Sequence, residues 1–229
     1  EVDGVDTAVG RVLLGEEEQV AVVVFKELVG CHDMAVGGRE QLGVVHVACG
    51  EGVVVDALVE QAAALHDILI VSMITVEGVK VGLCICEDLW YPDVAQKAKA
   101  MGAEILVACN ASPYEAGKAR QRERTVVGHA AAAGLGLIYV NCTGGQDELI
   151  FDGASFVSDD QGTIGLRLTA FDEEFAVFET AHSYEAVAVS EETPESELYK
   201  ALTLAVRDYV RKSGSTDVVL GLSGGIDSA

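Results

Sequence analysis

The stretch KVGLCICEDLWYPDVAQKAKAMGAEILVACN, residues 80–110, carries the clearest indication of the fold. Residues 80–85 form an apolar run of strand length, and residues 93–101 place apolar side chains at helical spacing. Residues 103–110 are again an apolar run, bounded by Gly102 on one side and polar residues on the other. A strand, a helix and a second strand in this order are typical of parallel β-α-β units, so we expect an α/β fold.

The same alternation extends in both directions along the chain. It predicts strands at 19–25, 68–74 and 137–141, helices at 55–66 and 116–134, and a hairpin of 152–158 with 162–167. A boundary is expected near 191–195, where Pro194 closes an acidic stretch. An amphipathic helix at 197–212 and a buried strand at 217–222 should follow it. Because one helix and one strand cannot bury a core of their own, we expect a C-terminal truncation.

The composition excludes several classes of protein. The 229 residues carry 15 Lys and Arg against 37 Asp and Glu, a net charge of −22, and half of them are apolar. This much apolar surface excludes disorder, and the acidic surface disfavours nucleic-acid binding. No run is long enough to span a membrane and no signal peptide is visible. The six cysteines show no metal-binding spacing with each other or with histidine, so no metal site is expected, and we expect reduced thiols in a cytoplasmic protein.

A cysteine follows the first strand of the opening stretch directly. Cys86 lies where the strand at 80–85 ends in the polar turn CEDLW. A thiol at a strand end faces a cleft, where nearby donors can stabilise the reactive thiolate. The pattern alone still favours the plainer interpretation, in which Cys84 and Cys86 are two small residues on one strand face.

Polar residues end two other strands at the same edge of the sheet. NASPY at 110–114 follows the strand at 103–110, and α/β folds bind ligands where the carboxyl ends of strands open. FKEL at 25–28 ends an earlier strand, so Glu27 offers a carboxylate there that can act as a base for a thiol. The alternative for Glu27 is a solvated loop acid.

The end of the chain carries a second pattern typical of ligand binding. SGGIDS at 223–228 follows the apolar run at 217–222. The two glycines let the backbone approach an anion, and N–H groups at a helix start point toward it. It is no Walker loop, because the GK[ST] signature is missing. The plainer interpretation is a glycine turn.

Two further polar groups favour plain structural roles. Arg120, Arg122 and Arg124 lie with acidic residues on the helix at 116–134, which is typical of a solvated helix face. GGQDE at 144–148 follows a strand, and its pattern alone is that of a turn.

Five segments resemble one family. ICEDLW (85–90), NASPYEAGKARQR (110–122) and YVNCTGGQDELIFDGASF (139–156) resemble the glutaminase domain of glutamine-dependent NAD+ synthetase, a branch of the nitrilase superfamily. ELYKALTLAVRDYVRKSG (197–214) and VVLGLSGGIDSA (218–229) resemble the start of its synthetase domain. The resemblance implies a nitrilase-type α-β-β-α sandwich in residues 1–190. Residues 191–229 would then be the first helix, strand and phosphate loop of an α/β ATP-pyrophosphatase domain.

The resemblance also implies the chemistry. Cys86 would form a thioester with glutamine and release ammonia, with Glu27 as general base and with Ser112, Lys118 and Glu87 binding the substrate. The ammonia would amidate deamido-NAD+ that ATP and Mg²⁺ have activated, and no tightly bound cofactor is expected in this chain. Family members assemble, so a homo-oligomer is expected. The implied ATP-binding residues are Gly221, Leu222, Ser223, Gly224, Gly225, Ile226, Asp227 and Ser228.

One part of the family pattern has no counterpart. The family's catalytic lysine lies between the strands matching 68–74 and 80–85, where this chain has only TVEGV at 75–79. We therefore expect a glutaminase domain that is incomplete between 74 and 80. Its activity should be impaired, because loss of one transition-state donor costs about 10²–10³ in rate. A stand-alone nitrilase-type amidase and a non-catalytic fragment or scaffold remain as alternatives.

Overall fold

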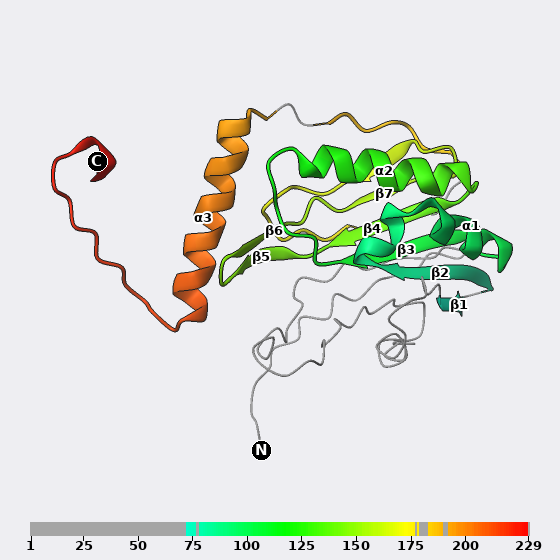
Figure 1. Ribbon diagram of the computed structural model, residues 1–229, viewed down its shortest axis with the longest axis horizontal. Coiled ribbons are helices and arrows are strands. Elements are labelled where there is room, and N and C mark those ends of the chain that lie inside the picture. The colour runs from blue at the N-terminus through cyan, green and yellow to red at the C-terminus, as the bar shows by residue number, and fades with distance from the viewer. Residues whose placement is uncertain (1–71, 77, 177, 179–182, 190–191, 229) are drawn as a thin grey trace, which may run out of the picture.

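The computed structural model describes residues 72–76, 78–176, 178, 183–189 and 192–228 (Figure 1). The predicted strand at 19–25, the helix at 55–66 and Glu27 lie outside these residues. The elements in chain order are β1 (Ser72–Val76), β2 (Val79–Ile85), the 3₁₀ turn η3 (Cys86–Trp90), α1 (Pro92–Ala100), β3 (Ile105–Asn110), α2 (Lys118–Ala132), β4 (Gly136–Asn141), β5 (Thr143–Gln146), β6 (Leu149–Asp152), β7 (Phe156–Ser158), β8 (Ile164–Arg167), α3 (Pro194–Lys212) and the 3₁₀ turn η4 (Ile226–Ser228).

Six strands form one sheet in the order β1-β2-β3-β4-β7-β8. The three central strands β2, β3 and β4 run parallel, and α1 and α2 connect them. Strands β1, β7 and β8 pair antiparallel at the two sides. The carboxyl ends of β2, β3 and β4 therefore meet at one edge, which is where ligands bind in folds of this class.

Both faces of the central strands are buried, as is usual for parallel strands. One face packs against α1 and α2, which lie along the same side of the sheet in Figure 1. Its core includes Leu106, Leu137 and Tyr139 from the sheet together with Val94 and Val126 from the helices. The other face carries a second apolar cluster, formed by Val76, Val81, Ile105, Val107, Ile138 and Val157.

The helices begin and end at residues suited to those positions. Pro92 opens α1, where its missing N–H has no helical partner to lose. Gly102 and Gly134 follow the ends of α1 and α2 with positive φ angles of 95° and 64°, which glycine adopts without strain. Thr193 caps α3, because its Oγ1 accepts a hydrogen bond of 3.2 Å from the Ser196 N–H.

Helix α3 packs on the small sheet formed by β5 and β6 (Figure 1). The backbone of β5 comes so close that a Cβ at Gly145 would lie 3.0 Å from the Cα of Ala205. The Asp208 carboxylate accepts a hydrogen bond of 2.8 Å from the Gly145 N–H, and Lys212 Nζ donates one of 2.8 Å to the Gly145 carbonyl. These contacts fix the helix to the hairpin at both apolar and polar positions.

Most predicted elements within the described residues are confirmed, with ends shifted by a few residues. These are the strands at 80–85, 103–110 and 137–141, the helices at 93–101, 116–134 and 197–212, and the hairpin of 152–158 with 162–167. The strand predicted at 217–222 is wrong, because these residues are exposed and no strand among the described residues pairs with them. Sequence reasoning also missed the β5–β6 hairpin. No helix among the described residues has the length and apolar character needed to cross a bilayer.

Candidate active site

Cys86 occupies a strained turn at the carboxyl edge of the sheet. It follows β2, opens η3, and has a φ angle of 44°. A non-glycine residue in this region of backbone space costs free energy and is typical of functional turns. Cys86 is exposed as a residue, unlike the buried Cys84, although part of its surroundings is shielded from water. The plainer interpretation, two small residues on one strand face, is wrong for this pair, because Cys86 belongs to η3 and not to β2.

Three polar or nucleophilic residues lie in a row at this edge, where the three parallel strands end. Ile85 pairs with Cys109, and the residues that follow this pair are Cys86, which opens η3, and Asn110, which ends β3. Asn110 pairs in turn with Asn141 of β4. Asn110 and Asn141 each come two residues after a side chain of the helix-side core, which places both on that face of the sheet.

The residues expected to bind substrate surround this row. Ser112 is buried just beyond β3, and Lys118 is the first residue of α2. Lys118 lies close enough to Cys86 to affect the thiol electrostatically. Glu87 follows Cys86, and its carboxylate accepts a hydrogen bond of 3.3 Å from the Tyr91 hydroxyl. The structure thus brings Ser112, Lys118 and Glu87 to the edge that carries Cys86.

Two contacts hold the turn that carries the cysteine. The Asp88 carboxylate accepts a hydrogen bond of 2.9 Å from the Ile85 N–H, closing η3 on itself. His129 of α2 lies with Nδ1 2.9 Å from the Leu89 carbonyl, so Nδ1 carries the proton. Because Leu89 is buried, η3 is fixed to α2 by packing as well as by this bond.

The Cys86 thiol is protonated near neutral pH. Burial raises its pKa, and the neighbouring Glu87 and Asp88 carboxylates add to the increase. The backbone N–H of Glu87 and the Lys118 ammonium act in the opposite direction but do not overcome it. A thiol in this state needs a base at the moment of attack.

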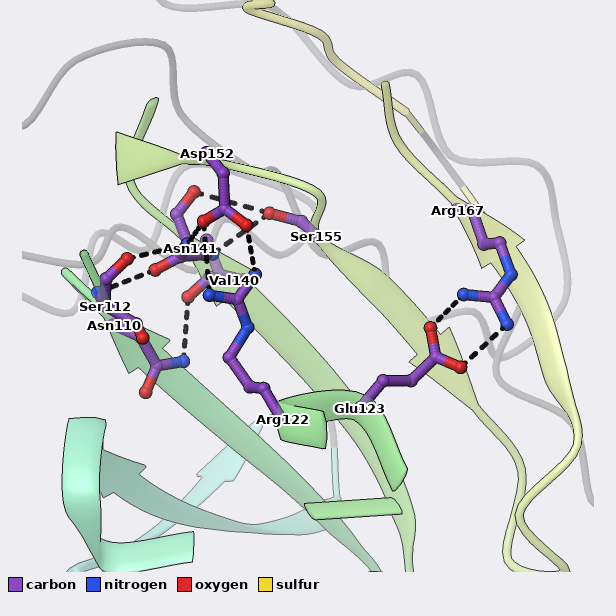
Figure 2. Close-up of polar contacts among 9 residues, drawn as sticks. All are labelled: Asn110, Ser112, Arg122, Glu123, Val140, Asn141, Asp152, Ser155 and Arg167. Carbon is purple, nitrogen blue, oxygen red and sulfur yellow. Dashed lines mark hydrogen bonds and ion pairs between the residues drawn. The ribbon is translucent and has the colours of Figure 1, made fainter. Parts of the chain in front are cut away.

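A buried polar network lies behind the row (Figure 2). Arg122 makes two hydrogen bonds to Asp152, of 3.1 Å and 2.9 Å, and both side chains are buried. Asp152 Oδ1 also accepts a hydrogen bond of 2.9 Å from Asn141 Nδ2. Asn141 Oδ1 accepts one of 2.9 Å from the Ser112 N–H, and the Asn141 N–H donates to Ser155 Oγ. The network therefore joins α2, β6 and β4 to the backbone of the predicted substrate residue Ser112.

The prediction of a solvated helix face is wrong for Arg122. Its side chain is 1% exposed and lies 5.6 Å above the ring of Tyr139, which stacks on Phe156. The sequence does contain the signal, because 122, 126 and 130 share one helical stripe and Val126 and Ala130 are buried. Sequence reasoning also missed Asp152 and Asn141 as members of the site.

The glycine-rich loop at 221–228 lies away from this edge, and its residues 221–227 are exposed (Figure 1). Gly224 has a φ angle of 77°, and the Gly225 N–H donates a hydrogen bond of 3.3 Å to Ser223 Oγ. Among the described residues no cluster of three His, Cys, Asp or Glu side chains could hold a metal ion. The loop conformation permits an anion, whereas the described residues do not provide a magnesium ligand set.

Comparison with known proteins agrees with this geometry. A family model described as carbon-nitrogen hydrolase matches residues 43–187, and one described as NAD synthase matches residues 198–229. The chain is 44% identical over 157 residues to glutamine-dependent NAD(+) synthetase of Rhodobacter capsulatus, covering 66% of this chain and 28% of that one. It is 40% identical over 193 residues to the Aquifex aeolicus enzyme of the same name, covering 69% and 34%.

A solved structure shows the same relationship in three dimensions. Glutamine-dependent NAD+ synthetase from Acinetobacter baumannii, in complex with ADP, superimposes with a TM-score of 0.61 at 33% identity. The match covers 82% of this chain and 35% of that one. The chain thus spans about a third of the length of the relatives it matches.

The chain belongs to the carbon-nitrogen hydrolase family, since that family's model matches more than half of it. Its α/β architecture is the one that the nitrilase resemblance implied. The relatives found are glutamine-dependent NAD+ synthetases, so the relationship predicted from the motifs around Cys86 is confirmed.

Proposed function

We propose that residues 1–190 form the nitrilase-like glutaminase domain of a glutamine-dependent NAD+ synthetase, and that residues 191–229 begin its synthetase domain. The observation that carries the proposal is the position of Cys86. Its exposed thiol lies on a strained turn at the carboxyl edge of the sheet, beside Ser112 and Lys118. Family membership and the synthetase relatives give the reaction class.

In the proposed reaction the Cys86 sulfur attacks the side-chain carbonyl carbon of L-glutamine. The thiol proton passes to a base, and the C–N bond breaks as ammonia takes up a proton. Water then hydrolyses the thioester to glutamate and restores the thiol. The base is Glu27 by resemblance, which suits a thiol whose pKa burial has raised.

The substrate contacts follow the same resemblance. Lys118 and Glu87 offer opposite charges for the α-carboxylate and α-ammonium of glutamine. Ser112 connects the buried Arg122–Asp152–Asn141 network to the edge of the sheet that carries Cys86. The backbone N–H of Glu87 already stabilises negative charge on Cys86, so it is placed to stabilise the oxyanion that forms beside the sulfur.

We propose that the glutaminase is slow in this chain because the family's lysine segment is absent. Val76 of β1 pairs with Val79 of β2, so the chain turns directly from one strand into the next. Lys80 is no replacement, because it begins β2 and Cys86 follows its end, about 20 Å away at 3.3 Å per residue. Its backbone N–H bonds to Glu104 at the opposite edge of the sheet.

The remaining partners are proposed for the whole protein. ATP would bind at Gly221–Ser228 with its pyrophosphate group toward the loop N–H groups, and deamido-NAD+ would be the acceptor of ammonia. Mg²⁺ would accompany ATP, and no step above depends on it. A cytoplasmic homo-oligomer is proposed by family resemblance.

The test is glutamate formation from L-glutamine by the purified chain, with Cys86→Ala as control. We expect a rate about 10²–10³ below that of a complete relative, because one transition-state donor is missing. A rate within about tenfold of the relative would contradict the proposed role of the missing lysine. If glutamine is not bound at all, a non-catalytic scaffold that joins complete subunits becomes the better account.

A further inference from the structure

Only three buried side-chain atoms among the described residues lack a hydrogen-bond partner. They are Asn110 Oδ1, Arg122 Nε and Ser158 Oγ. A buried polar atom without a hydrogen bond destabilises the folded protein. A ligand that forms this hydrogen bond on binding would remove that cost. The other two guanidinium nitrogens of Arg122 donate to Asp152, so this side chain belongs to the buried network. Ser158 pairs with Leu137 near the start of β4, at the opposite edge of the sheet from Cys86. Asn110 is the one that lies at the edge of Cys86, because it ends β3, the strand beside β2, and β3 contacts η3.

The orientation of the Asn110 amide is determined by its neighbours. Asn110 Nδ2 lies 3.0 Å from the Ala108 carbonyl and 2.9 Å from the Val140 carbonyl. Carbonyl groups only accept hydrogen bonds, so the nitrogen must face them and the oxygen must face away. Figure 2 shows this oxygen on the side of the amide turned away from the Val140 carbonyl and from the Arg122–Asp152 pair.

Asn110 therefore presents a fixed, buried acceptor at the edge of the sheet that carries the reactive thiol. The residue is 5% exposed, and β3 contacts η3, the turn that carries Cys86. The backbone N–H of Glu87 is a hydrogen-bond donor to the same thiol. A donor at the nucleophile and an acceptor at the same edge of the sheet match a carboxamide, whose C=O accepts and whose NH₂ donates.

We propose that Asn110 is a specificity-determining residue that accepts a hydrogen bond from the NH₂ of the substrate carboxamide. The proposal rests on the proposed function of this site as a glutamine-binding glutaminase. Asn110 Oδ1 selects a primary amide over an ester or an acid, because an ester or carboxylate oxygen would bring a second acceptor against it. The two bonds from Nδ2 hold the acceptor in place, so selection needs no rearrangement.

The test compares two ligands in the Cys86→Ala protein, where neither can react. Dissociation constants for L-glutamine and L-glutamate γ-methyl ester are measured by calorimetry. The ester keeps the carbonyl and the α-groups but has no N–H to donate. We expect glutamine to bind about tenfold or more tightly than the ester, because the ester leaves a buried acceptor unpaired. Asn110→Leu in the same background should reduce the ratio to about threefold or less.

The ratio separates recognition from structure. Loss of the Nδ2 bonds alone would weaken both ligands equally and leave the ratio unchanged. Ser158→Ala removes another unpaired buried atom at the far edge and should leave the ratio as in the parent. Should Asn110→Leu fail to fold, Asn110→Ala gives the same comparison.

Two results would overturn the proposal, and they differ from each other. In the first, the parent binds glutamine, but the ratio of the two dissociation constants is near one or is unchanged by Asn110→Leu. Asn110 then does not distinguish the amide from the ester, and the proposed function stands. If a folded parent binds neither ligand, the proposed function fails and the role of Asn110 fails with it.

Discussion

Removal of the Arg122 guanidinium should cost more stability than any surface change on the same helix. Arg122→Met keeps the length and apolar stem of the side chain but leaves the Asp152 carboxylate buried without its cation. Asp152 is 2% exposed, and among the described residues its carboxylate would keep the hydrogen bond from Asn141 Nδ2 as its one remaining side-chain contact. Removing one partner of a buried pair costs about 3–5 kcal/mol, because the remaining charge has lost its compensation. The contact of the guanidinium with the Tyr139 ring adds about 0.5–2 kcal/mol.

Urea unfolding followed by fluorescence measures this cost. Trp90 is the only tryptophan, and it lies half-buried at the end of η3, so it reports on the turn of Cys86. Glu123→Gln is the matched control on the neighbouring position of α2. Glu123 pairs with Arg167, and both side chains are partly exposed, so its loss should cost about 1 kcal/mol or less. Equal costs for the two variants would refute the account of the network as a buried support of the site.

Three further outcomes follow from particular residues. Lys118→Gln should slow alkylation of Cys86 at pH 7 and move the pH profile upward, because the ammonium lowers the pKa of the thiol. Asp159→Asn should reduce stability at pH 7 by about 1–3 kcal/mol, measured by urea unfolding. Burial alone would raise the pKa of Asp159, but the N–H groups of Thr163, Tyr184 and Gln161 lower it overall. The ionised carboxylate therefore stabilises the fold above about pH 4, the pKa of an unfolded Asp, and this contribution is lost as the pH falls through the lowered pKa of the folded state. Gly153→Ala should lower the free energy of unfolding by more than about 1 kcal/mol, because φ is 62° and a Cβ would collide with Thr143 Oγ1.

Each of these has a control within the chain. Lys80 lies farther from Cys86 than the distance over which salt screens a charge, so Lys80→Gln should leave the pH profile of Cys86 alkylation unchanged. Asp160→Asn, next to Asp159, should cost less stability at pH 7, because the Asp160 carboxylate accepts a hydrogen bond from the exposed Gln161 side chain. Gly128→Ala in α2 has open space for a Cβ and should stabilise by up to about 1 kcal/mol. A shift of the alkylation profile in Lys80→Gln would contradict the argument for Lys118. A loss of stability in Asp159→Asn that stays constant down to about pH 3 would contradict the argument for Asp159, and an unchanged free energy of unfolding in Gly153→Ala would contradict the argument for Gly153.

The strands and helices between residues 80 and 167 could be predicted because local periodicity and burial agree there. Residues 105–109 are apolar on both faces, and the structure places them at the centre of the sheet, between two parallel neighbours. The strand predicted at 217–222 has the same local pattern but, within the part of the chain that the structure describes, no neighbouring strand to pair with it. A strand depends on its partner, so its sequence alone does not establish it.

The site could be predicted in part. The positions of Cys86, Ser112 and Lys118 near one edge of the sheet could be predicted, since each lies at the carboxyl end of a strand or the start of the next helix, whereas their roles stay predictions. The supporting network could not, because Arg122 and Asp152 are 30 residues apart in sequence and meet only when β6 returns beside α2. Asn110 was visible as a polar residue ending a strand, but its unpaired oxygen depends on the positions of the Ala108 and Val140 carbonyls.

The most direct test of the central claim is the intact mass of the chain after reaction with a diazo-ketone analogue of glutamine. The analogue must be recognised as glutamine before it alkylates a thiol. We predict one adduct on the folded chain, its loss in Cys86→Ala, and its suppression by excess L-glutamine. A folded chain that gains no adduct, or that gains the same adduct in Cys86→Ala, would contradict the assignment of Cys86 as a glutamine-directed nucleophile.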